Sequence, residues 1–188
     1  MALSDFLWLP YQRWRHYKGY GVHSPFAYQM VNDVVNPGNY GYYVYSEIKK
    51  SLKKETSFDE LHKESDLKLI ARLAISLGCN RIIALGFQSL LLRRLTLALK
   101  KKYESCKTIS FLRKPASDLV VITGSSVSSL EIDKMMEAGI AVISFNPDFE
   151  LRNELEKERQ NGLVFTGKNI IIAIPRREMA FVSYAMKF

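Results

Sequence analysis

The sequence contains few cysteines: only Cys79 and Cys106 occur among its 188 residues. Neither belongs to a C-x-x-C pair and neither has a neighbouring histidine, so the spacing typical of zinc ligands is missing. Two isolated cysteines also do not form the disulfide framework of a small secreted domain. We therefore expect a cytoplasmic protein with reduced thiols and no bound metal.

Long apolar runs are missing as well. No stretch approaches the roughly 20 consecutive apolar residues that a membrane-spanning helix needs. Residues 1–10 lack the basic region and the small-residue cleavage site of a signal peptide. The content of 47% hydrophobic and 24% charged residues is ordinary for a globular protein. The sequence thus predicts one structural unit without a transmembrane segment.

Acidic residues are outnumbered, because 19 Asp and Glu stand against 27 Lys and Arg, which gives a net charge of +8. Such a surface attracts polyanions, so a nucleic-acid-binding protein remains an alternative. Some clusters have a simpler explanation, since Lys100–Lys102 would suit the carboxyl end of a helix. The basic clusters are Arg13/Arg15/Lys18, Lys49/Lys50/Lys53/Lys54, Arg93/Arg94, Lys100/Lys101/Lys102, Arg113/Lys114 and Arg176/Arg177.

Residues 1–78 are predicted to form a helical extension that covers the rest of the protein. Six aromatic residues lie between Phe6 and Tyr20, with basic residues interleaved. This pattern favours an amphipathic helix that docks on the domain over one that lies on a membrane. If some of these aromatic residues are exposed, they could form the interface of a homodimer. Ser24 followed by Pro25 is a strong helix start, because serine caps the amino end and proline fits the first turn.

Residues 79–188 alternate between apolar strands and amphipathic helices, which is typical of an α/β Rossmann-like domain. The first strand ends on Gly86 and turns directly into a helix, as in nucleotide-binding domains. Two strands, Ile170–Ile174 and Ala180–Lys187, are predicted to pair as a C-terminal antiparallel hairpin. The other expected elements are strands at Arg81–Leu85, Thr108–Phe111, Asp118–Thr123, Ile140–Phe145 and Leu163–Thr166, and helices at Gln88–Lys102, Gly124–Met136 and Asp148–Gln160.

Three stretches resemble a group of bacterial proteins with a class I S-adenosylmethionine-dependent methyltransferase fold. Gly21–Phe26 resembles the N-terminal H-G-V-H-S-P-F signature of that group, with Tyr20 in place of its first histidine. Arg81–Gly86 is similar to its I-L-E-L-G cofactor strand, and Ile170–Phe188 to its last two strands. The resemblance implies a class I methyltransferase sheet and S-adenosylmethionine as cofactor. The positions that it implies for cofactor binding are Gly86, Phe87, Gln88, Ser89, Gly124 and Ser125.

The chain departs from the family pattern where the cofactor would bind. In the turn E-x-G-x-x-x-G, Gly86 is kept, but Ala84 replaces the acid that helps to hold the methionine end, and Leu90 replaces the second glycine. The acid that would bind the ribose hydroxyls is missing from Ser110–Arg113. Thr123 stands where metal-dependent relatives carry an aspartate, so no Mg²⁺ ligand is expected there.

The connection between two expected strands is short. Only Leu112–Ser117 separate Thr108–Phe111 from Asp118–Thr123. These residues span about 20 Å when extended, whereas a parallel crossover usually needs a dozen residues or more. The sequence therefore predicts a sheet trimmed by one strand and one helix, with a damaged adenine pocket.

His23 is the one residue with catalytic potential. If the extension folds over the strand ends, its imidazole could act as a base or contact the substrate. The alternative, which we favour, is a histidine that precedes a capped helix and hydrogen-bonds locally. Ser125 has a similar alternative as an ordinary helix cap.

The sequence favours a methyltransferase-like protein with a degraded S-adenosylmethionine site and weak or no catalysis. Such a protein would bind an unidentified small molecule or protein in a structural or regulatory role. One alternative is an active S-adenosylmethionine-dependent methyltransferase that binds its cofactor in a divergent way. The other is a basic nucleic-acid-binding protein.

Overall fold

The computed structural model describes residues 11, 14, 16, 21–37, 43–54, 63–86, 90–106, 118–123, 127–157 and 161–188. Several predicted features lie outside these residues. They are the strand at Thr108–Phe111 and the candidate cofactor residues Phe87, Gln88, Ser89, Gly124 and Ser125.

The described strands form one seven-stranded sheet in the order β2-β1-β3-β4-β6-β5-β7. Six strands run in one direction and β6 is antiparallel to its neighbours β4 and β5. The strands are β1 (Arg81–Gly86), β2 (Lys102–Cys106), β3 (Asp118–Thr123), β4 (Ala141–Phe145), β5 (Leu163–Thr166), β6 (Ile170–Ile174) and β7 (Val182–Ala185). This mixed, mostly parallel sheet with helices on both faces confirms the predicted α/β, Rossmann-like fold.

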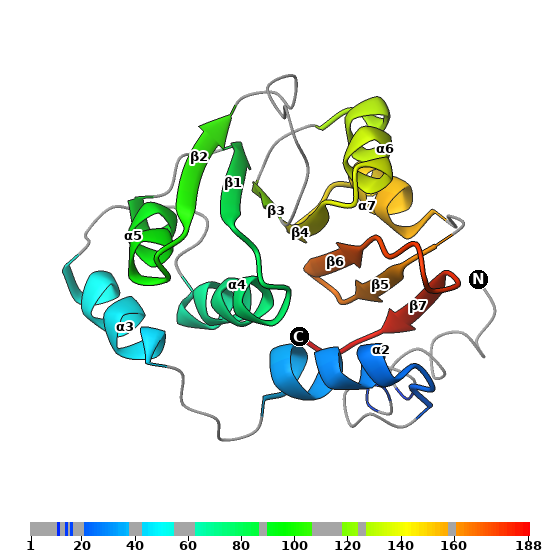
Figure 1. Ribbon diagram of the computed structural model, residues 1–188, viewed down its shortest axis with the longest axis horizontal. Coiled ribbons are helices and arrows are strands. Elements are labelled where there is room, and N and C mark those ends of the chain that lie inside the picture. Colours follow the sequence, from blue (N-terminus) through cyan, green and yellow to red (C-terminus); the bar gives the residue numbers. More distant parts are fainter. Residues whose placement is uncertain are drawn as a thin grey trace.

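The helices cover the two faces of the sheet unequally. In Figure 1, α2 to α5 lie below and to the left of the strands, whereas α6 and α7 lie above them. The short π-helix η1 continues α2 directly. The helices are α2 (Pro25–Met30), η1 (Val31–Val35), α3 (Val44–Lys54), α4 (Glu64–Ser76), α5 (Leu90–Ala98), α6 (Ser129–Glu137) and α7 (Phe149–Glu156).

The core is divided by the sheet into two layers. Along β1, Ile82 and Ala84 belong to the cluster under α2–α5, whereas Ile83 and Leu85 belong to the cluster under α6 and α7. Successive side chains of a strand point to opposite faces, so a continuously apolar strand such as β3 is buried on both sides. The residues of the extension from Val22 onward share the first cluster with the sheet, and they complete its core.

Three helices end in the same way before a strand. After α4 and α6, glycines with positive φ (Gly78, +62°; Gly139, +77°) turn the chain. After α5 the same turn is made by Lys100 at φ 55°. The Lys100 amide donates to the Leu97 carbonyl and the Lys101 amide donates to the Thr96 carbonyl, which is the Schellman pattern.

The turn at Lys100 corrects one prediction. The helix expected to run to Lys102 ends at Ala98, and Lys102 begins β2. Residues 107–117 join β2 to β3, and the strand expected at Thr108–Phe111 and the link expected at Leu112–Ser117 lie within this segment, outside the described residues. The two strands also lie on opposite sides of β1.

The pairing of the last strands also differs from the prediction. Ile170–Ile174 does not pair with the strand that follows it; β6 pairs with β4 on one edge and β5 on the other. Because both edges of β6 are occupied, β7 crosses over and adds parallel to β5. The antiparallel hairpin is therefore β5–β6. Its turn is held by Arg152 of α7, which donates to the carbonyls of Gly167 and Lys168.

Candidate functional site

The carboxyl ends of β1, β2 and β3 meet at one edge of the sheet, where ligands bind in open α/β folds. Gly86 ends β1 with φ 102°, a conformation that favours glycine, and lies opposite Thr123 at the end of β3. The segments that follow these strands, residues 87–89, 107–117 and 124–128, contain no Asp or Glu. A carboxylate for an ammonium or a ribose hydroxyl is thus missing from all three.

The residues at the substituted positions are part of the core. Ala84 is 2% exposed and packs under α2–α5, and Thr123 is 3% exposed. The acids within β1, β2 and β3 are Glu104 and Asp118, and the Asp118 side chain lies at the opposite edge, where it pairs with Arg81. Neither Ala84 nor Thr123 supplies a carboxylate at these positions.

The amino end of α6 differs from the expected site at Gly124 and Ser125. The helix begins at Ser129, and Ser128 is its N-cap. The Glu131 carboxylate accepts a hydrogen bond from the Ser128 amide at 3.1 Å and completes a capping box. The Ser128 amide at this end of the helix therefore already has an acidic hydrogen-bond acceptor, the Glu131 side chain.

The signature Gly21–Phe26 holds the extension on the last strands of the sheet. Ser24 caps α2 by accepting a hydrogen bond from the Ala27 amide at 3.3 Å, and Pro25 occupies the first turn. The Arg176 guanidinium stacks on the Phe26 ring, 3.9 Å from its centroid. These contacts confirm the helix start that the sequence predicts and indicate a docking role for the signature.

Tyr184 of β7 is the main contact beneath this signature. Its phenol group lies beside the backbone of His23 and Ser24, and its ring stacks on Phe165 with centroids 5.8 Å apart. The His16 ring meets it edge-on, and His16 Nδ1 lies 3.1 Å from the Ala185 carbonyl oxygen. Burial raises the pKa of Tyr184, and the backbone of His23 and Ser24 acts in the opposite direction.

His23 is not brought near Gly86. Its side chain is exposed, and its backbone contacts β7, the edge strand at the far end of the sheet from β2. Five strand spacings of about 4.8 Å separate β7 from β1, which amounts to about 24 Å. The neighbouring Phe26 also contacts Arg176, which follows β6 at the amino edge. A ligand held by Gly86 would lie beyond the reach of His23.

A cavity of about 440 Å³ opens at the carboxyl edge, on the face covered by α2–α5. Ile170, which lies opposite the last residue of β4, places it at this edge. The first turn of α4 reaches the same edge, because this helix runs back to the start of β1. The volume falls within the range of small-molecule sites. The lining residues are Trp14, Val35, Ser65, Asp66, Leu69, Arg72, Ile170, Lys187 and Phe188.

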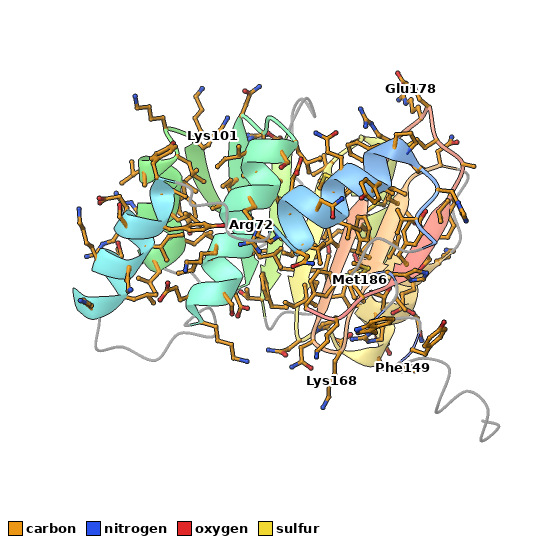
Figure 2. All side chains as sticks on the ribbon, turned by 90° about the horizontal axis from the view of Figure 1, so that it is seen from below. Arg72, Lys101, Phe149, Lys168, Glu178 and Met186 are labelled. Atoms are coloured by element: carbon orange, nitrogen blue, oxygen red, sulfur yellow. The ribbon has the colours of Figure 1, made fainter. Side chains whose placement is uncertain are left out.

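Arg72 is the buried cation of this cavity. Its side chain extends from the middle of α4 (Figure 2), and the residue is 9% exposed. Nε donates to the Val34 carbonyl at 2.6 Å and Nη1 to the Tyr45 hydroxyl at 3.0 Å. Within the described part of the chain, no carboxylate forms an ion pair with it. A buried charge without a counter-ion is costly, which makes this position unusual.

Two further charged groups line the cavity. Lys187 is exposed at its rim. Asp66 is partly buried, and this burial raises the pKa of its carboxyl group, against the hydrogen bond from Ser65 and the charge of Lys63. Sequence reasoning singled out none of these three charged residues. The available signal was Arg72 itself, a charge within the apolar stripe of α4.

A basic surface lies at the other end of the sheet, where α3 packs against α5 and α5 against β2. Among the described side chains of α3, α5 and the turn before β2, Glu47 is the one acid. It pairs with Lys50. We call this surface the basic end; its exposed cations are Lys49, Lys50, Lys53, Arg93, Lys100 and Lys102. Figure 2 shows Lys101 projecting at the amino edge, away from Lys168 and Phe149 at the carboxyl edge.

Comparison with models of known protein families gives no match, and comparison with curated proteins gives no significant match. Among the residues that the structure describes, no cluster of His, Cys, Asp and Glu could hold a metal ion. The same residues include no helix that is long and apolar enough to cross a membrane. The function therefore has to be inferred from the site itself.

Proposed function

We propose that this protein is a methyltransferase-like binding protein whose S-adenosylmethionine site is degraded and whose catalysis is weak or absent. One observation carries the proposal: the segments that follow β1, β2 and β3 contain no acid. The cofactor carries an ammonium group and two ribose hydroxyls that require acceptors, and carboxylates are the usual ones.

The likeness to a methyltransferase rests on topology and on the signature. An antiparallel strand, β6, lies between β4 and β5 near one end of an otherwise parallel sheet, although its antiparallel partners are not the strand at Ala180–Lys187 that the resemblance implies. A helical extension covers one face, and Gly21–Phe26 docks it. Both features support descent from a methyltransferase-like fold without requiring its reaction.

The residues present do not fit the cofactor, and we assign no methyl-transfer step to them. Gly86 retains the backbone conformation of a ligand-binding turn, but Ala84 offers no charge, and Leu90 adds a side chain where the family pattern has glycine. His23 lies too far away to serve as a base at that turn. What remains at the carboxyl edge is the cavity lined by Arg72 and Asp66.

Isothermal titration with S-adenosylmethionine and S-adenosylhomocysteine tests the proposal. We expect no saturable heat at 1 mM ligand and no shift in melting temperature. A ligand that binds the folded protein at a concentration well above its Kd would raise the melting temperature measurably. Gly86→Ala serves as the matched variant, since a Cβ at φ 102° strains the turn. Micromolar binding that this variant abolishes would establish the alternative, an active enzyme with divergent cofactor binding.

The basic end supports a second candidate function, the binding of nucleic acid. Six exposed cations lie on adjoining elements, and phosphate contacts of such cations give affinity that falls steeply with salt. The test is retention of a short duplex at 50 mM and 200 mM salt. A Lys49→Gln, Lys53→Gln, Arg93→Gln variant should lose retention if this function is correct, and equal retention by the variant would reject it.

A further inference from the structure

We infer that the cavity at the carboxyl edge binds a small oxyanion, a carboxylate or a phosphate group, that is attached to an aromatic ring. The inference deepens the proposed function, because it names the class of ligand that the binding protein holds. It rests on that proposal only in treating the cavity as the ligand site.

The first observation is the unused hydrogen-bonding capacity of Arg72. A guanidinium has five N–H donors in a rigid fork. Two donor nitrogens are engaged, Nε by Val34 and Nη1 by Tyr45, and no hydrogen bond from Nη2 to a described residue occurs. The two contacts fix the plane of the group, and Arg72 is one of the residues that line the cavity, so we assign the remaining donors to this space. A planar fork of this kind matches carboxylate and phosphate oxygens.

The second observation is the direction of α4. Its first turn, which includes Ser65 and Asp66, lines the cavity, and no side chain caps its amino end at Lys63. The positive end of the helix dipole therefore points toward the same space as Arg72. Lys187 adds an ammonium group at the rim. Arg72, Lys187 and the amino end of α4 therefore lie around one cavity. Among the described residues that line it, Asp66 carries the one side-chain carboxylate, and Glu64 of the same turn pairs with Lys68.

The third observation concerns the walls. Trp14 and Phe188 line the cavity with rings that are 52% and 38% exposed, and Leu69 and Val35 supply aliphatic surface. Exposed aromatic rings beside a buried cation suit a flat, apolar ligand body. Phe188 packs over Gly167, where a Cβ would overlap its ring. The glycine thus lets the Phe188 ring lie close to the turn between β5 and β6.

The roles of the charged groups follow from these positions. The oxyanion is placed between the Arg72 fork and the Lys187 ammonium, and the ring of the ligand lies against Trp14 and Phe188. The Asp66 carboxyl accepts a hydrogen bond from an N–H or O–H group of the ligand. A ligand with the same shape but no negative charge would leave Arg72 buried without a counter-ion.

The test uses isothermal titration of the full chain with indole-3-acetate and with its neutral amide, indole-3-acetamide. We expect saturable binding of the acid and at least about tenfold weaker binding of the amide, as for a charge-assisted hydrogen bond that is lost. The affinities for phenyl phosphate and for inorganic phosphate are compared in the same way. Tighter binding of phenyl phosphate is expected if the site requires the aromatic ring as well as the oxyanion. Equal affinity for acid and amide, or no binding of any of these probes at 5 mM, would overturn the inference.

Two lysine variants localise the site. Lys187→Gln should weaken binding of the acid by about fivefold, because it removes one rim charge. Lys168→Gln, an exposed lysine that does not line the cavity, should change it by less than about twofold. Equal effects of the two variants would contradict the assignment. Arg72→Lys should weaken binding further, and its melting curve shows whether the fold persists.

These outcomes are separable from failure of the proposed function. Saturable binding of S-adenosylmethionine refutes the degraded site but leaves the preference for acid over amide unaffected. Competition decides whether the two sites are one: we expect excess S-adenosylmethionine not to displace indole-3-acetate. Displacement would mean that the cavity is part of a cofactor site, and the inference would fail.

Discussion

Replacement of Tyr184 by Phe tests whether the signature Gly21–Phe26 is a docking device. The phenol oxygen of this 5%-exposed residue interacts with the backbone of His23 and Ser24. Its removal takes away the polar neighbour of these backbone groups. Loss of a buried polar partner costs about 1–3 kcal/mol, so we expect a loss of about 2 kcal/mol. For a chain of this size that corresponds to a melting temperature lower by about 4–8 °C.

The matched control is His23→Ala. Its side chain is exposed, so the substitution should change stability by less than about 0.5 kcal/mol. The assay is thermal unfolding of both variants beside the unsubstituted protein. A stable Tyr184→Phe protein, or a His23→Ala protein destabilised by more than 1 kcal/mol, would refute the docking interpretation.

The pH dependence gives a second measurement on the same residue. Burial raises the pKa of Tyr184 above its ordinary value of about 10, so the folded state retains this proton when the unfolded state has released it. The stabilisation is complete below pH 10 and is lost as the pH rises through the folded-state pKa. Tyr184→Phe should therefore show a shallower fall in stability above pH 10. Identical alkaline slopes for the two proteins would contradict this.

Three further predictions follow from buried polar groups. Burial raises the pKa of Cys79 to about 11, so a Cys106→Ser protein should react with a thiol reagent at pH 8 only after unfolding; rapid labelling of the folded protein would contradict this. Ser144 Oγ is buried and has no hydrogen-bond partner among the residues that the structure describes, so Ser144→Ala should be neutral or stabilising by up to about 1 kcal/mol in denaturant unfolding, and a clear destabilisation would disprove it. Asp118→Asn should cost about 3 kcal/mol in the same assay, because the Arg81 charge loses its buried partner; a loss below 1 kcal/mol would argue against a role for this pair in stability.

The ends of the helices show how far the sequence could predict the fold. Gly78 and Gly139 mark the ends of α4 and α6, since glycine adopts positive φ readily. Lys100 makes the same turn after α5 without such a marker. The sequence pattern therefore extends the predicted helix to Lys102, whereas the structure begins β2 at that residue.

Strand pairing at the C-terminus needed information that is not local. Ile170–Ile174 and Val182–Ala185 are close in sequence, which favours a hairpin, but pairing depends on which strand edges are already occupied. The candidate cavity depended on tertiary structure even more. Arg72, Ile170 and Lys187 are far apart in the chain and lie around one cavity only because α4 packs on the carboxyl edge of the sheet.

The most direct test of the central claim, that the turn after β1 no longer holds S-adenosylmethionine, is an NMR titration of ¹⁵N-labelled protein with this cofactor. The reporter is the Gly86 amide at the end of β1. We expect no saturable chemical-shift change at Gly86 up to 2 mM cofactor. A saturable shift centred on Gly86 and on Thr123, its neighbour across the strands, would contradict the account and establish a functional cofactor site.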